Sequence, residues 1–116
     1  MPTVNLGVGE FIDRYSILEI KNTKGLDVIT ELEQYKTIVF EEFANLPAFT
    51  YYCNILEVIN EQLWDLEIDK RQVERNTKTE SDIAYLITQL NDIRSTTKKA
   101  ADEFFASEIK EIKNYT

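Results

Sequence analysis

Four acidic side chains occur as two pairs at helical spacing, a pattern that suits a divalent cation. Glu10 and Asp13 are three residues apart, and Glu61 and Asp65 are four apart, so within a helix each pair shares one face. Carboxylate oxygens are the ligands that Mg²⁺ prefers. These four residues are therefore candidate metal ligands, with magnesium as the candidate cofactor. The alternative is structural, because acids in the first turn of a helix also stabilise its dipole.

A second polar group follows one helical face at steps of 4, 3 and 4: Asn60, Trp64, Glu67 and Arg71. Trp64 could stack on a base or sugar, and Arg71 could bind a phosphate through two parallel hydrogen bonds. Asn60 lowers helix stability unless its amide has a partner. The structural alternative places Trp64 in the core and pairs Glu67 with Arg71 along the helix.

A third group, Asn91, Arg94 and Lys98, lies beside an apolar seam through Leu90 and Ile93. Two cations and an amide on one stripe could hold an anion, or could pair with the acids of other helices in a structural network. The candidate ligand-binding residues are Asn60, Trp64, Glu67, Arg71, Asn91, Arg94 and Lys98.

Composition excludes several classes of site. The chain has no histidine and a single cysteine, Cys53, which excludes histidine-based zinc sites, histidine-dependent nucleophiles and an intramolecular disulfide. With 21 acidic and 13 basic residues the net charge is −8, which disfavours binding to nucleic acid or to anionic membranes. No apolar run approaches the ~20 residues of a membrane span, and no signal peptide is visible. We expect a cytoplasmic protein.

The elements that must position these groups are helices. Apolar residues recur at steps of 3 and 4, with no alternating strand pattern, which predicts an all-α, four-helix bundle-like single domain over residues 1–116. The expected helices are 9–24, 27–46, 50–76 and 79–111, the last two being long. Gly25 is a stop signal, Asp27 and Thr50 are candidate caps, and Thr77 with Glu80 forms a capping box.

Two features predict contact with a second copy of the chain. The first helix has apolar residues on two faces, so it is either central or part of a subunit interface. The last helix would be ~40 Å long or more. Either the weak helix formers at 95–97 interrupt it, or its end, with Phe104 and Phe105, projects toward another chain. We therefore expect a homodimer.

The three polar groups together resemble one family of small helical proteins, bacterial and phage, which is classified only as a domain of unknown function. The match covers the first, third and fourth predicted helices. It departs from the family at Ile68, where the family is acidic, and at Lys70, where it is apolar. The resemblance implies a shared helical fold and a convergence of the three groups, but no activity. It rests on Gly9-Glu10-Phe11-Ile12-Asp13, Ile17-Leu18-Glu19-Ile20-Lys21, Asn60-Glu61, Leu63-Trp64-Asp65, Glu67 through Arg71, Asn91-Asp92, Arg94 and Lys98.

Two functional hypotheses follow. The first is a non-catalytic module that self-associates and binds a protein partner or a small phosphorylated ligand. The second is a Mg²⁺-dependent nucleotide pyrophosphohydrolase, similar in outline to the all-α MazG-type enzymes, in which the four carboxylates hold the metal and Arg71, Arg94 and Lys98 grip phosphates. The acidic signature of those enzymes is incomplete here, because Asn45 stands three positions after Glu42.

Overall fold

The chain folds into four helices and is described here by a computed structural model covering residues 7–114, with side chains through Ala106. The helices are α1 (Val8–Thr23), α2 (Ile29–Phe43), α3 (Pro47–Gln72) and α4 (Lys78–Asn114), and no strand occurs in the described range. The all-α class and the two long final helices are confirmed. The molecule measures 59 × 29 × 21 Å, so it is markedly elongated.

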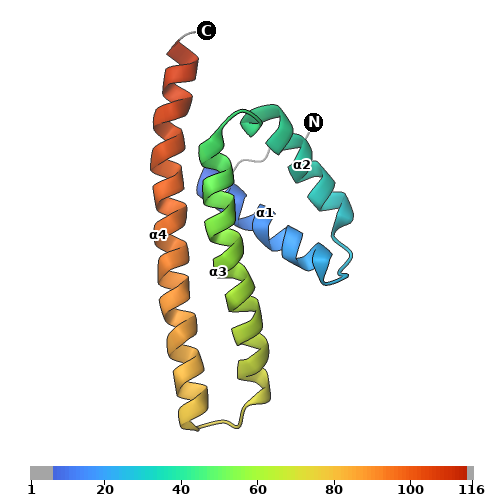
Figure 1. Cartoon of the computed structure of the whole chain (residues 1–116), viewed down its shortest axis with the longest axis vertical. Helices are drawn as coiled ribbons and strands as arrows, with labels where there is room; N and C mark the ends of the chain where they lie inside the picture. Colours follow the sequence, from blue (N-terminus) through green and yellow to red (C-terminus); the bar gives the residue numbers. More distant parts are fainter. Residues whose placement is uncertain (1–6, 115–116) are drawn as a thin grey trace.

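The long axis is formed by α3 and α4, which run side by side in opposite directions (Figure 1). The first helix crosses this pair near its upper half and contacts all three other helices. The second helix packs beside α1, away from α4 (Figure 1). The lower half of the α3–α4 pair has neither α1 nor α2 beside it (Figure 1).

The hydrophobic core of the described residues consists of two clusters, one in the upper half of the molecule and one between α3 and α4. A main cluster fills the space between α1, α2 and the upper part of the helix pair, and it explains the two apolar faces of α1. A smaller cluster of Ile59, Leu63 and Ile87 lies between α3 and α4 alone. The main cluster comprises Phe11, Ile12, Leu18, Leu32, Tyr35, Phe49, Leu56, Ala101 and Phe105.

One of the predicted helix signals is confirmed, and a second is confirmed in part. At Gly25, φ is +83°, and the N–H groups of Leu26 and Gly25 donate to the carbonyls of Lys21 and Asn22, both at 3.0 Å. This is the Schellman arrangement that glycine favours. At the start of α4, the Thr77 hydroxyl accepts from the Glu80 N–H at 3.2 Å, whereas the Glu80 carboxylate accepts from the N–H of Asn76 at 3.0 Å and not from that of Thr77, so only the Thr77 half of the predicted capping box is formed.

Several helix boundaries differ from the prediction. The cap residue of α2 is Val28 and that of α3 is Leu46, neither with a side-chain capping bond, so Asp27 and Thr50 are not caps. The third helix begins at Pro47 because proline suits the first helical position. It ends at Gln72, and Asn76 has φ of 63°, which a right-handed helix does not allow.

The predicted alternative of an interruption at residues 95–97 is wrong. The helix α4 runs continuously from Lys78 to Asn114. Within it, the Thr97 hydroxyl donates to the carbonyl of Ile93 at 2.8 Å, so this polar group is satisfied without breaking the helix.

Candidate functional site

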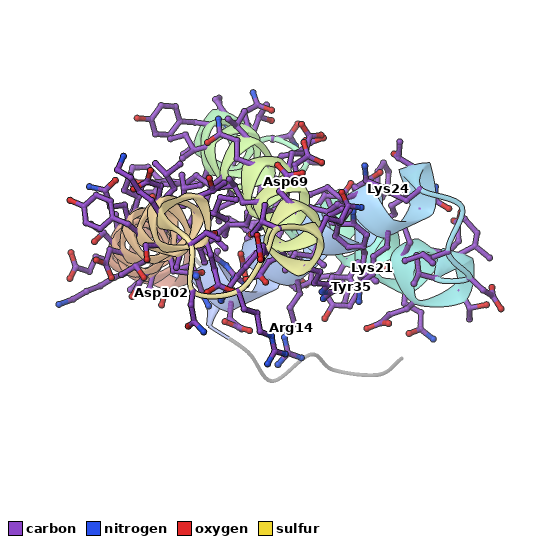
Figure 2. The ribbon with its side chains drawn as sticks, turned by 90° about the horizontal axis from the view of Figure 1, so that it is seen from below. Arg14, Lys21, Lys24, Tyr35, Asp69 and Asp102 are labelled. Atoms are coloured by element: carbon purple, nitrogen blue, oxygen red, sulfur yellow. The ribbon has the colours of Figure 1, made fainter. Side chains whose placement is uncertain are left out.

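The start of α1 is fixed against α4 by a close approach at Gly9. A Cβ added there would overlap the backbone oxygen of Lys98 and lie 2.8 Å from its carbonyl carbon, so only glycine fits without moving a helix. The Gly9 N–H donates to the Asp102 carboxylate at 2.7 Å, and Asp102 lies beside the start of α1 (Figure 2). A carboxylate from α4 thus supplies the cap that Gly7 lacks, and sequence reasoning missed both roles.

One turn further along α1, Asp13 joins three helices. Its carboxylate accepts from Arg94 Nε at 2.8 Å and Arg94 Nη2 at 2.6 Å on α4. It also accepts from Asn60 Nδ2 at 2.9 Å on α3. The same amide donates to Ser16 Oγ at 2.8 Å, and Ser16 Oγ donates to the Asp13 carbonyl at 2.7 Å. The structure therefore brings one member of each predicted polar group together.

The Asp13 carboxylate is charged although its side chain is only 1 % exposed. Burial acts to raise its pKa, but the hydrogen bonds from Arg94 and Asn60 and the charges of Arg94 and Lys98 outweigh burial and lower the pKa. The bond to Asp13 in turn raises the pKa of Arg94. Within the described side chains no buried nitrogen or oxygen lacks a hydrogen-bond partner. The network is complete by itself, and it holds α1, α3 and α4 in one arrangement.

Lys98 and Glu10 extend this network toward solvent. Lys98 pairs with the Glu10 carboxylate and lies 3.8 Å from Asp13. Arg14 Nε binds the other oxygen of Glu10 at 3.0 Å. The hydrogen bonds from Lys98 and then from Arg14 lower the pKa of Glu10. Glu10 and Asp13 are therefore neutralised by cations of the chain itself.

Next to the network lies a hollow of about 340 Å³, called here the α1–α3–α4 groove. Six of the seven predicted ligand-binding residues line it; Lys98 does not, because it faces Glu10. The other walls are apolar. The groove is lined by Ile17, Ile20, Asn60, Leu63, Trp64, Glu67, Ile68, Arg71, Asn91 and Arg94.

The polar side chains of the groove differ in how many of their hydrogen-bond donors already have partners within the protein. Arg94 uses Nε and Nη2 for Asp13, and its Nη1 makes only a long bond of 3.5 Å to Asn91 Oδ1. Among the described side chains, no ion pair involves Arg71, and the expected pair with Glu67 is not formed. Lys24 Nζ lies 5.8 Å from the Trp64 ring centroid. Arg71 is thus a guanidinium with its donors open to solvent.

The four candidate metal ligands are not brought together. Glu10 and Asp13 belong to the ion-pair network, whereas Glu61 and Asp65 line a separate hollow of about 140 Å³ with Lys24. Within the described part of the chain, no three acidic or cysteine side chains are grouped as a metal site would require.

A hollow that the sequence did not indicate lies between α1, α2 and α3. It has a volume of about 370 Å³ and is lined in part by Tyr15, Glu19, Cys53 and Glu57. Burial, then the nearby carboxylates Glu57 and Glu19, raises the pKa of the Cys53 thiol to about 12. Such a thiol is not reactive near neutral pH.

Comparison with models of known families, with curated proteins and with solved structures finds no match to this chain. In the described range, no helix is both long enough and apolar enough to cross a membrane.

Proposed function

We propose that the protein is a non-catalytic binding module, located in the cytoplasm, whose α1–α3–α4 groove takes a small phosphorylated ligand. The observation that carries this proposal is the groove itself. Six side chains that the sequence selected as ligand-binding line one hollow of about 340 Å³, a volume within the range of small-molecule sites.

The lining suits a ligand with an anionic end and a flat or apolar body. Arg71 can form two parallel hydrogen bonds to a phosphate, because no described side chain occupies it in an ion pair. Trp64 offers an aromatic wall, and Ile17, Ile20 and Leu63 offer apolar contact. Five of the ten lining residues are apolar or aromatic and five are polar or charged, so the groove offers both the apolar contact and the orienting polar groups that ligand sites use.

The buried network favours binding because it holds the groove in shape. Asn60 and Arg94 belong to both the network and the groove. Their side chains are already fixed by Asp13, so they lose little further conformational freedom when a ligand contacts them.

The pyrophosphohydrolase hypothesis receives less support from this geometry. It requires Glu10, Asp13, Glu61 and Asp65 around one metal ion. The first two are bound to Lys98, Arg14 and Arg94, and the second two line a different hollow.

The test is a thermal-shift panel of nucleoside phosphates, sugar phosphates and inorganic phosphate, each with and without Mg²⁺. A ligand at about 100 times its Kd adds about 2.7 kcal/mol, which is several degrees for a domain of this size. The variant Arg71→Gln removes the guanidinium that forms no ion pair among the described side chains. Arg75→Gln is the matched control, since Arg75 is exposed and is not among the residues lining the groove.

We expect at least one phosphorylated probe to stabilise the wild type and Arg75→Gln, but not Arg71→Gln. A shift equally large in both variants would place the ligand elsewhere. If no probe in the panel shifted the melting temperature, the proposal of a phosphorylated ligand would be overturned. Turnover of a probe that requires Mg²⁺ would favour the enzyme hypothesis.

A further inference from the structure

The α3–α4 pair has an apolar surface that no part of the described chain covers. Val58 is 54 % exposed on α3, and Leu86 and Ile93 are 46 % and 51 % exposed on α4. Tyr51 is seven residues before Val58, and Ile93 is seven after Leu86, so each set repeats along one side of its helix. We call the surface formed by Tyr51, Val58, Leu66, Leu86, Ile93 and Phe104 the outer face.

The outer face lies on the opposite side of the helix pair from the α1–α3–α4 groove. Val58 and Asn60 are two residues apart, and so are Ile93 and Asn91, which places the members of each pair about 160° apart around their helix. Asn60 and Asn91 line the groove.

A shallow hollow of about 390 Å³ runs along the lower part of the outer face. Its apolar residues are Leu66, Leu86, Leu90 and Ile93. Leu66 and Leu90 also pack on the small core of Ile59, Leu63 and Ile87, and they are only partly buried. The small core in the lower half of the α3–α4 pair is therefore incompletely covered, because two helices alone cannot enclose a hydrophobic core.

The polar residues in this hollow suit a second copy of the same chain. With a net charge of −8, two copies repel, so a surface that joins them must be nearly free of charge. Of the seven residues that line the hollow, only Asp65 is charged. Gln62 and Gln89 are amides, which both donate and accept, so each can bond its own symmetry mate across a two-fold axis.

The extent of the outer face also fits a dimer. From Leu86 to Phe104 is 18 residues, or about 27 Å along α4. Two adjacent helices are about 20 Å wide, so the projected area is roughly 500 Å². A corrugated helical surface has a larger accessible area than its projection, approaching the ~800 Å² per partner of a standard interface.

We propose that a second copy of the chain packs on the outer face, so that α3 and α4 of both copies enclose the small core in a four-helix arrangement. The site is an isologous interface with a two-fold axis near Gln62 and Gln89. The groove stays open in the dimer because it lies on the other side of the pair.

The experiment measures mass by light scattering and sedimentation across the micromolar range. The variants Ile93→Glu and Val58→Glu each place a charge on the outer face, one on each helix. Both positions are about half exposed, so folding should persist, and circular dichroism checks it. The control Phe40→Glu changes a residue of α2 that is 77 % exposed and lies outside the outer face.

We expect twice the chain mass of 13.6 kDa for the wild type and Phe40→Glu, and a dissociation constant raised at least tenfold in both outer-face variants. A monomeric wild type would overturn the proposal, and the outer face would then be assigned to a partner other than a second copy of the chain. An undiminished dimer in either folded outer-face variant would also overturn the proposal. Arg71→Gln should remain dimeric, which keeps this result separate from ligand binding in the groove.

Discussion

Asp13 connects stability and the candidate site at the scale of one residue. Its side chain is buried, and it holds Arg94 from α4 and Asn60 from α3. Both of those partners line the α1–α3–α4 groove. The charge that fixes the three helices therefore also determines which donors of Arg94 remain available to a ligand.

Replacing Asp13 by Asn should destabilise the protein by about 3 kcal/mol, because the Arg94 guanidinium would lose its buried counter-ion. Glu10→Gln is the matched control. Its side chain is 36 % exposed, so solvent screens its ion pairs and the expected loss is under about 1 kcal/mol. Urea unfolding of the two variants beside the wild type measures both values. Equal losses would show that burial of the Asp13 pair does not matter.

At the scale of the helices, the periodicity of apolar residues was sufficient to predict the class and the number of elements. Local signals worked where the stabilising contact is itself local, as at Gly25 and Thr77. The predicted ends of α2 and α3 were wrong because Pro47 begins α3 and Asn76 turns left-handed. Neither effect is visible from the spacing of apolar residues.

The candidate site was predictable only in part, for a similar reason. Helical spacing selected the residues of the groove, since each set shares one face of its own helix. Spacing cannot say which helices cross, so it could not separate the Glu10–Asp13 pair from Glu61 and Asp65. The same limit hid Asp102, which caps α1 from 93 residues away.

The close contact between α1 and α4 at Gly9 leads to a second prediction about stability. Gly9→Ala should destabilise the protein by about 1–3 kcal/mol, because the new methyl group would overlap the Lys98 backbone and force the helices apart. At Gly7, the three atoms nearest to an added Cβ belong to the Asp102 side chain, the closest at 3.0 Å, so a small shift of this side chain, and not of a helix, relieves the contact. Gly7→Ala should therefore cost less, and thermal unfolding compares the two. A smaller loss at Gly9 than at Gly7 would contradict this crossing.

For the whole molecule, charge acts against the compact state at neutral pH. The excess of acids gives a net charge of −8, and a sequence pI near 4.5. Glu57 is an example, because burial and its neighbours Glu61 and Glu19 raise its pKa. An acid whose pKa is raised by folding binds a proton more readily in the folded state, so it adds stability as the pH falls.

Stability should therefore rise as the pH falls from 7 toward 4.5 and then decrease. The pKa values of Glu10 and Asp13 are lowered from ordinary values of 4.5 and 3.8. Their contribution is complete above those values and is lost as the pH falls below them through the folded pKa values, because the unfolded state then binds more protons. Urea unfolding at half-unit pH steps measures the profile, and the Asp13→Asn variant should lose part of the acid decrease.

The salt dependence of stability distinguishes the two contributions to this pH profile, which are charge repulsion between acids and the buried Asp13–Arg94 pair. High salt should flatten only the part of the rise between pH 7 and 4.5 that comes from repulsion of Glu57 by Glu61 and Glu19, because salt screens charges but does not change burial. It should change the acid decrease much less, because solvent ions cannot reach the Asp13–Arg94 pair, whose carboxylate is 1 % exposed. If high salt removed both parts equally, the buried network would contribute no more to acid stability than the surface charges do.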